Sequence, residues 1–260
     1  MSAYIATDAV AYEHSMGRWS RALAEPFLDV LDLRPGAKVL DAGCGTGALT
    51  AAILARDPTA QATGVDVGEA YVEAARAAIP EARFEVGDIA SMRIPSGSQD
   101  AALGLLVMAF LPDPPAAVKE MARVTVPGGV VATAMWDFWG GFPFLRLLAD
   151  TAAVVLREGA EWRDRYWTHP IGTPGRLRSL FEASGLHDVR ERDIAIRQDF
   201  QGFDDWWSPW LTGQGIVGAF VAGLEAPARG RLEGALRRAW GADGPRSFVA
   251  TARMATGRVA

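Results

Sequence analysis

A strand, a glycine-rich loop and a helix follow one another early in the chain, and this succession constrains the fold more than any other feature. Lys38 to Asp41 reads as a buried strand, Gly43, Gly45 and Gly47 lie in the loop, and Ala48 to Ala55 reads as a helix. Glycines let such a loop approach a ligand closely, because no Cβ atom stands in the way. The succession predicts the first βα unit of a parallel sheet.

The same rhythm continues through the first half of the chain. Further strands are predicted at 62–66, 83–87, 100–107 and 130–135, with helices at 69–78 and 114–124. The apolar run from Asp100 to Val107 is typical of a central parallel strand that is buried on both faces. Before the first strand, apolar residues recur every four positions from Trp19 to Leu31 and predict an amphipathic helix with a candidate kink at Pro26.

Beyond Trp136 the pattern changes. Residues 137–172 are rich in Trp, Arg and Gly and contain a predicted helix at 144–157. We interpret this stretch as a helical cap inserted over the carboxyl edge of the sheet. A helix at 173–184 and two alternating strands, 189–200 and 246–255, complete the chain. The expected units are a core with an N-terminal lid helix (1–136), the cap (137–172) and the completion of the sheet (173–260).

Composition narrows the class of protein. The chain has 260 residues, 50% of them hydrophobic, and a net charge of −5 with its Lys and Arg scattered. Nucleic-acid and anionic-membrane surfaces normally carry a basic footprint, so neither partner is expected. No signal peptide or membrane span is predicted, and the single cysteine, Cys44, provides neither an internal disulfide nor a cysteine-based metal site. We expect a cytoplasmic, bacterial protein with a small-molecule substrate, and a homodimer is a candidate assembly.

Aspartates end two of the predicted strands. Asp66 follows Gly47 by 19 residues, where a carboxylate can accept hydrogen bonds from two ribose hydroxyls. Asp88 ends the third strand and could reach the amino group of a base. Either aspartate could instead cap a loop or form a turn.

The loop also discriminates between two cofactors. Dinucleotide sites usually show G-x-G-x-x-G facing a pyrophosphate, whereas this loop reads G-x-G-x-G with Asp41 two residues before the first glycine. A carboxylate there suits a ligand with an ammonium and a sulfonium better than a pyrophosphate. The loop therefore favours S-adenosylmethionine over NAD.

With these motifs, the stretch from Tyr12 to about Ala134 resembles class I methyltransferases of the group that includes the ubiquinone and menaquinone biosynthesis C-methyltransferases (methyltransferase type 11). The matching segments are Val39–Gly47, Gly64–Asp66, Gly87–Ile89, Asp100–Leu103 and Val126–Gly129. The resemblance implies S-adenosyl-L-methionine as cofactor. It also implies a Rossmann-like, doubly wound α/β sheet of seven strands in the order 3-2-1-4-5-7-6, with the last strand antiparallel.

The resemblance also implies roles for residues of the site. Asp41 and the backbone of Gly43 and Gly45 would hold the methionine part, and Asp66 the ribose. Val67 would pack on adenine, Asp88 and Ile89 would contact its edge, and Leu105 and Leu106 would lie beside the methionine and the methyl group. Cys44 lies inside the loop and is expected among the cofactor-binding residues, with packing favoured over a nucleophilic role. Tyr12 and Arg18 precede the sheet in a segment that often folds over the cofactor in relatives. Arg18 could pair with the cofactor carboxylate or lie on a solvated helix face.

One departure concerns catalysis. Many relatives carry histidine in the segment that reads Met108-Ala109-Phe110-Leu111 here, so no catalytic base is transferred from the family. His14 and His169 are the candidate catalytic histidines, and a structural role is the alternative for each. No role is assigned to His187.

The resulting hypothesis is methyl transfer to oxygen, carbon or nitrogen of a small, apolar or aromatic metabolite. Aromatic residues in and beside the cap suit such an acceptor, although a small cap also needs aromatic residues for its own core. They are Trp136, Trp139, Phe142, Phe144, Trp162 and Trp167, with Trp206, Trp207 and Trp210 further on. Three alternatives stay open: a reaction other than methylation, an NAD-dependent oxidoreductase, and a catalytically silent subunit that binds an adenosyl ligand.

Overall fold

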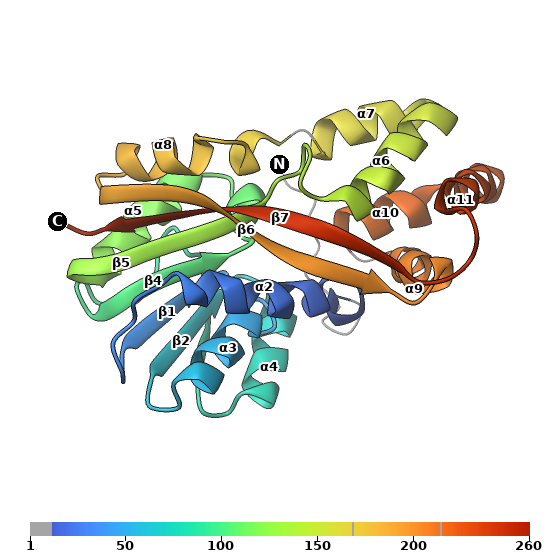
Figure 1. The fold of residues 1–260 in the computed structure, drawn as a ribbon. Helices are drawn as coiled ribbons and strands as arrows, with labels where there is room; N and C mark the ends of the chain where they lie inside the picture. Colours follow the sequence, from blue (N-terminus) through green and yellow to red (C-terminus); the bar gives the residue numbers. More distant parts are fainter. Residues whose placement is uncertain (1–11, 168, 214) are drawn as a thin grey trace.

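One seven-stranded sheet organises the protein in the computed structural model, which describes residues 12–167, 169–213 and 215–260 (Figure 1). The strands are β1 (Lys38–Ala42), β2 (Gln61–Asp66), β3 (Arg83–Val86), β4 (Gln99–Leu105), β5 (Thr125–Trp136), β6 (His187–Phe200) and β7 (Arg246–Arg258). Their order is β3-β2-β1-β4-β5-β7-β6. The first five are parallel, and β7 lies antiparallel between β5 and β6. This confirms the predicted fold, strand order and antiparallel last strand.

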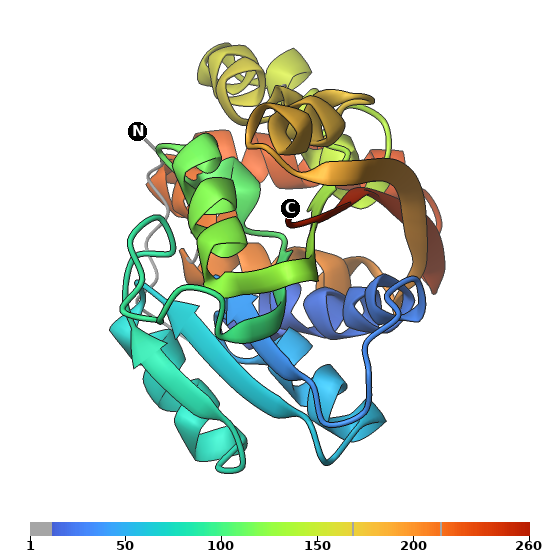
Figure 2. The same ribbon diagram turned by 90° about the vertical axis from the view of Figure 1, so that its left-hand side faces the viewer.

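Helices cover both faces of the sheet (Figures 1 and 2). One face carries α2 (Arg18–Asp29), α3 (Ala48–Arg56) and α4 (Glu69–Ala78), and the other carries α5 (Pro114–Val124) and α8 (Arg176–Ala183). A short π-helical turn, η1 (Glu13–Gly17), leads into α2, and a 3-10 turn, η2 (Met108–Phe110), follows β4. All strand-to-helix loops of the parallel strands therefore open at one edge, as the alternating pattern requires.

A second group of helices gathers at one end of the sheet, on the right in Figure 1. It contains α6 (Pro143–Val155), α7 (Arg157–Tyr166), α9 (Phe203–Trp207), α10 (Gly215–Gly223) and α11 (Ala226–Trp240), with the 3-10 turns η3 (Pro170–Gly172) and η4 (Ser208–Thr212). The helix predicted at 144–157 is broken at Leu156, which is extended, and α7 begins after it. Because α6 packs on both α7 and α11, two separate stretches of chain form this helical end. The cap boundaries 137 and 172 stay a prediction.

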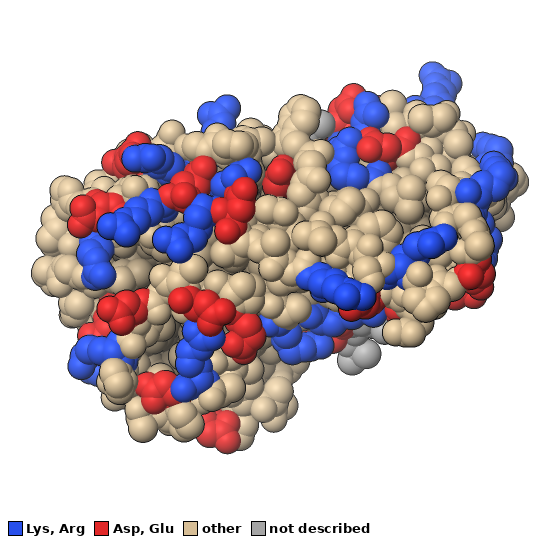
Figure 3. Space-filling model, viewed as in Figure 1, with Lys and Arg blue, Asp and Glu red and all other residues tan. Residues whose placement is uncertain are grey.

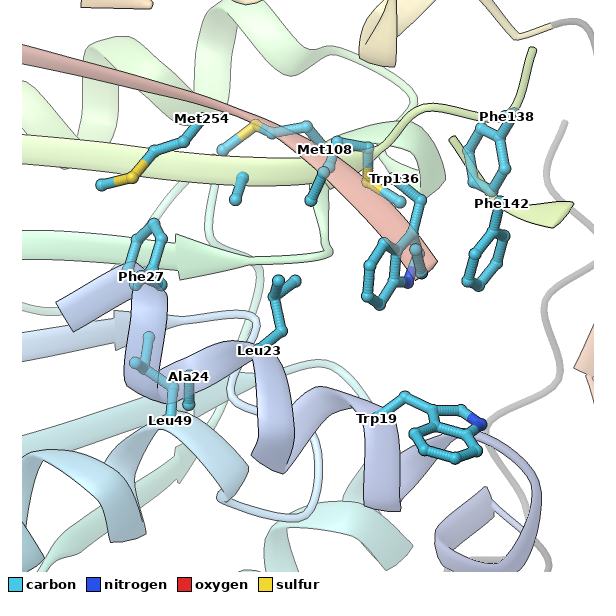
Figure 4. Close-up of a cluster of buried hydrophobic side chains, with 14 of the residues drawn as sticks. Trp19, Leu23, Ala24, Phe27, Leu49, Met108, Trp136, Phe138, Phe142 and Met254 are labelled. Atoms are coloured by element: carbon cyan, nitrogen blue, oxygen red, sulfur yellow. The ribbon is translucent and has the colours of Figure 1, made fainter. Parts of the chain in front are cut away.

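The amphipathic stripe before β1 packs α2 onto the sheet. Leu23 and Phe27 are fully buried, and Figure 4 shows both directed toward the sheet. Burying side chains of this size stabilises a fold by about 1.5–3 kcal/mol each. The helix continues through Pro26 to Asp29.

Strand β5 is longer than the sequence predicts. The Pro127-Gly128-Gly129 segment, which precedes the strand predicted at 130–135, lies inside β5, and the register with β4 shifts between Gln99 and Ala101. Gly128 has a left-handed φ of 74°, which accommodates the irregularity. The backbone N–H of Gly128 instead bonds to Val259 O (2.9 Å), beyond the end of β7.

Acidic and basic side chains are interleaved on the surface. On the face drawn in Figure 3, blue and red residues lie close together in several places. Ion pairs such as Arg34–Asp100 (2.7 Å) join acidic and basic side chains of the protein. Among the described helices, none is both long enough and apolar enough to cross a membrane.

Substitutions at two glycines test how the helices pack at the helical end of the molecule. A Cβ at buried Gly159 of α7 would collide with the carbonyl of Ala152 in α6, whereas a Cβ at exposed Gly230 of α11 would meet nothing within 4 Å. We expect Gly159→Ala to lower the free energy of unfolding by about 1–3 kcal/mol. Gly230→Ala should raise it by about 0.5–1 kcal/mol, because alanine is the better helix former. Urea denaturation measures both, and equal effects of the two substitutions would contradict this packing.

Candidate active site

The carboxylate of Asp41 is buried at the end of β1, with 1% of the residue exposed. Its Oδ2 accepts hydrogen bonds from the backbone N–H (3.0 Å) and the hydroxyl (2.7 Å) of Thr50 in α3. Its Oδ1 is also buried and has no partner within the described residues. Burial, with a smaller contribution from the charge of Asp66, raises the pKa of Asp41 to about 7. A fixed, unpaired carboxylate oxygen of this kind suits an ammonium group.

The glycine loop is held against β2 and is open on its other side. The N–H of Gly43 donates to Val65 O (2.8 Å), and a Cβ at Gly43 would collide with Val107. Gly45 has a left-handed φ of 52°, and a Cβ there would meet nothing within 4 Å. Packing therefore requires glycine at position 43, while position 45 faces space that a ligand could occupy.

Asp66 ends β2 and ties the loop to it. One carboxylate oxygen accepts from Gly45 N–H (2.9 Å) and the other from Gly68 N–H (2.8 Å). Burial raises the pKa of Asp66. Each oxygen has a second lone pair, so both can still accept from ribose hydroxyls. The next residue, Val67, is 68% exposed, which leaves an apolar surface suited to a purine ring.

Asp88 and Ile89 follow β3. Asp88 is exposed, and its Oδ1 accepts from Ala90 N–H (2.8 Å), so it forms the turn that was the alternative interpretation of this residue. The side chain of Ile89 is buried in the core. A contact of Ile89 with adenine would therefore involve its backbone.

Leu105 and Leu106 end β4 and are half-buried. Leu106 has a φ of 63°, a left-handed conformation that leucine rarely adopts, and its N–H donates to Ala134 O of β5 (2.8 Å). Strained residues of this kind are often found at functional sites.

The segment before α2 folds onto the glycine loop. Glu13 of η1 accepts a hydrogen bond from the hydroxyl of Thr46 in that loop. The hydroxyl of Tyr12 lies 3.1 Å from that of Ser20, and the Tyr12 ring lies against Tyr71 of α4 with 5.3 Å between centroids. Burial raises the pKa of Tyr12 to about 12. The sequence placed Tyr12 near the cofactor but did not identify Glu13, because nothing local marks its partner Thr46.

Arg18 contacts the helical end of the molecule. Its guanidinium pairs with Asp205 of α9 (3.1 Å) and lies over the rings of Trp19 (4.3 Å) and Phe200 (4.8 Å). With these partners, Arg18 does not lie on a solvated helix face, which was one of the two expectations for it. A contact with the cofactor carboxylate stays a prediction.

Cys44 packs beneath the loop. It is buried in a small apolar cluster with Ile79 and Phe84, and burial raises the pKa of its thiol. A protonated, enclosed thiol is a poor nucleophile, which favours the packing role.

His169 lies beside the end of β5. A Cβ on Gly172 of η3 would collide with Trp136 O, which shows how closely the segment after His169 approaches that strand. Nδ1 of His169 accepts from Ile171 N–H (3.3 Å), and burial lowers the pKa of the ring. The neutral ring therefore carries its proton on Nε2. The side chain of His14, the other candidate, lies outside the part that the structure describes.

Taken together, Asp41, the loop glycines, Asp66 and Val67 lie at one edge of the sheet and fit S-adenosylmethionine. The unpaired Oδ1 of Asp41 suits the ammonium, the open space at Gly45 accommodates a ligand, and exposed Val67 offers a surface for adenine.

Comparison with known proteins identifies the family. Residues 39–129 match the family described as "Methyltransferase domain". The chain is 30% identical to nocamycin O-methyltransferase of Saccharothrix syringae, over 72% of each protein. It is 33% identical to trans-aconitate 2-methyltransferase of Variovorax paradoxus over 64% of this chain, and it spans 60% of that relative's length. Phosphoethanolamine N-methyltransferase 2 of Haemonchus contortus, solved with S-adenosyl-L-methionine, superposes with a TM-score of 0.60 at 15% identity, covering 98% of this chain and 58% of that one.

The chain belongs to the class I S-adenosylmethionine-dependent methyltransferases, the family that the motifs predicted. S-adenosyl-L-methionine is therefore its cofactor, and the choice of this cofactor over NAD was correct.

Replacing Asp41 should have opposite effects on the stability of the protein and on its affinity for the cofactor. Folding raises its pKa from 3.8 to about 7, so the unfolded chain loses this proton at lower pH than the folded one. The contribution of Asp41 to stability should fall from about pH 4 to pH 7, and the full cost of its buried charge is present above pH 7. We expect Asp41→Asn to raise the free energy of unfolding at pH 8 by about 1–3 kcal/mol, and to have a smaller effect at pH 5.

The same substitution should weaken binding of S-adenosylhomocysteine at pH 8 by about tenfold or more, because the carboxylate that pairs with the ammonium is lost. Wild-type affinity should increase from pH 6 to pH 8, and affinity of the variant should not. Denaturation and titration calorimetry at each pH measure the two effects. Unchanged affinity in the variant would contradict the role of Asp41.

A second prediction concerns the contribution of Asp66 to cofactor binding. Asp66→Ala should weaken cofactor affinity by about 1–3 kcal/mol through lost ribose hydrogen bonds. Asp57→Ala is the matched control. Asp57 also accepts from backbone, at Gly36 N–H (2.7 Å), but it precedes β2 at the opposite edge of the sheet. Calorimetric titration should show a loss for Asp66→Ala only, and an equal loss in both variants would contradict the ribose-binding role.

Proposed function

We propose that this protein transfers the methyl group of S-adenosylmethionine to oxygen, carbon or nitrogen of a small, apolar or aromatic metabolite. The observation that carries the proposal is the buried Oδ1 of Asp41, which lacks a partner within the described residues. This unpaired oxygen supports the binding of a cation at the end of β1, where the methionine part of the cofactor is expected. When bound, the cofactor supplies a methyl group on a positively charged sulfonium.

The residues of this chain act mainly by binding and orienting. Asp41 would fix the methionine part, Asp66 the ribose, and Val67, Asp88 and Ile89 the adenine, while Leu105 and Leu106 would lie beside the methyl group. The contact of Glu13 with Thr46 closes η1 over the loop and helps to exclude water. Alignment of donor and acceptor is worth up to about 7–11 kcal/mol of the barrier.

We also propose His14 and His169 as catalytic residues. With Nδ1 occupied by the N–H of Ile171, neutral His169 keeps Nε2–H as the group that could donate to an acceptor at the end of β5. To act as a general base, the ring would have to turn and release Ile171. His169 is therefore better suited to orient an acceptor oxygen than to remove its proton.

The nature of the acceptor is inferred from the end of β5. Trp136, Phe142 and Phe144 are buried there, close to the strand ends that hold the cofactor, whereas Trp139 is 55% exposed. An aromatic wall favours a flat or apolar acceptor over a highly charged one. We further propose that the protein is cytoplasmic and forms a homodimer, and that residues 137–172 form a cap over the carboxyl edge of the sheet.

Parallel titration with S-adenosylmethionine, S-adenosylhomocysteine and NAD tests the cofactor, and incubation with methyl-labelled S-adenosylmethionine and a panel of aromatic acceptors tests the reaction. We expect micromolar binding of both adenosyl ligands, no binding of NAD, and label in at least one acceptor. Binding without transfer to any acceptor would favour a non-methylating or silent member of the fold. Failure of both adenosyl ligands to bind would overturn the proposal.

A further inference from the structure

Four aromatic rings form a continuous cluster between α2 and the end of β5. We call Trp19, Trp136, Phe142 and Phe144 the aromatic cluster. Trp136 stacks on Phe142 with 4.6 Å between centroids, Phe142 meets Phe144 edge-on at 4.9 Å, and Phe144 lies 6.4 Å from Trp19. Figure 4 shows Trp136 directed from β5 toward α2, with Phe142 beside it and Trp19 below.

The aromatic cluster adjoins the proposed cofactor site on two sides. Trp136 is the last residue of β5, and Ala134 in the same strand accepts the hydrogen bond from Leu106 at the end of β4. Trp19 belongs to α2, which continues from η1, where Glu13 contacts the glycine loop. A methyl acceptor beside Leu105 and Leu106 would therefore lie next to these rings.

Two polar atoms of the cluster are left without partners. Trp19 and Trp136 are only 6% and 2% exposed, and neither indole N–H has a hydrogen-bond partner within the described residues. A buried donor without an acceptor is unfavourable, because it has lost its hydrogen bond to water. The neighbouring Trp206 shows how such a group can be satisfied, because its indole N–H donates to Phe144 O (3.2 Å). Other buried indole N–H groups also lack a partner within the described residues, among them that of Trp210, whose ring lies 6.3 Å from Phe144. Trp19 and Trp136 are set apart by their position beside the proposed cofactor site. In Figure 4 both unpaired nitrogens lie on the side of the ring away from Leu23 and Phe27.

The charged side chain that contacts the aromatic cluster, Arg18, already has an acidic partner. Arg18 lies over the Trp19 ring, but its guanidinium pairs with Asp205. The two indole groups are neutral donors, which favour a neutral oxygen over a carboxylate, since a buried carboxylate needs a full positive partner.

We propose that the aromatic cluster binds the methyl acceptor, and that the indole N–H of Trp19 or Trp136 donates to a neutral carbonyl-type oxygen on it. The acceptor is thus an uncharged aromatic compound that carries a ketone or similar carbonyl oxygen in addition to the nucleophilic oxygen, carbon or nitrogen, which takes the methyl group and loses a proton. Because both rings are buried, it enters only when the contact between α2 and the sheet opens. This inference rests on the proposed function, which supplies the neighbouring methyl donor.

Three naphthalene probes test the proposal. 2-Acetylnaphthalene carries the carbonyl, 2-isopropenylnaphthalene has nearly the same shape without it, and 2-naphthoate carries a charge. Titrations of the full chain followed through the ¹⁵N-labelled indole N–H signals should show a downfield shift of Trp19 or Trp136 with the ketone only. The ketone should bind about three- to tenfold more tightly than the hydrocarbon, as one net hydrogen bond allows.

Phenylalanine variants identify the donor. Trp19→Phe or Trp136→Phe should remove the preference for the ketone, because the N–H is lost and most of the ring is kept. Trp240→Phe is the matched control. Its N–H is also unpaired within the described residues, but it contacts Phe248 on the part of β7 that extends past β5. Its signal and the ketone preference should not change.

Equal binding of ketone and hydrocarbon, tighter binding of the naphthoate, or no binding of any probe would overturn the proposal. The titrations are run with and without S-adenosylhomocysteine, whose own affinity is measured in the same samples. Loss of that affinity would indicate failure of the proposed function, whereas the probe preference reports on the aromatic cluster alone.

Discussion

The buried carboxylate of Asp41 is the constraint on which the rest of the site depends. Thr50 fixes one oxygen through two hydrogen bonds and leaves the other enclosed and unpaired within the described residues. A charge in this position raises the free energy of the protein alone and lowers it when a cation is near. In the proposed role of Asp41, the free chain would give up some stability for affinity toward a positively charged ligand, with Asp66 and the glycine loop close by.

One element connects the cofactor side of this edge to the aromatic side. The η1–α2 segment contacts the glycine loop through Glu13 and the helical end through Arg18, which reaches Asp205 of α9. Its apolar stripe meanwhile packs on the sheet through Leu23 and Phe27. A displacement of this segment would expose both the loop and the aromatic cluster. Binding of cofactor and acceptor can thus be coupled through the same few contacts.

The sheet was predictable because its determinants are local. Alternation of apolar strands with helices of period 3.6 predicted the parallel strands, and the resemblance supplied the order and the antiparallel last strand. The errors also had local causes. The sequence predicted one helix at 144–157, because no proline or glycine marks the break at Leu156. It placed the start of the fifth strand at 130, although a bulge keeps Pro127-Gly128-Gly129 inside β5.

The sequence by itself determined the fold, the cofactor and the strand ends at which Asp41, Asp66 and Asp88 lie, because each depends on a motif a few residues long. Only the tertiary structure decided which distant groups meet. Glu13 and Thr46 are 33 positions apart, and Arg18 and Asp205 are 187 apart, so no local pattern links them. The same holds for the aromatic cluster. Whether an indole N–H finds an acceptor depends on every element packed around it, and the chain specifies this only when it is folded.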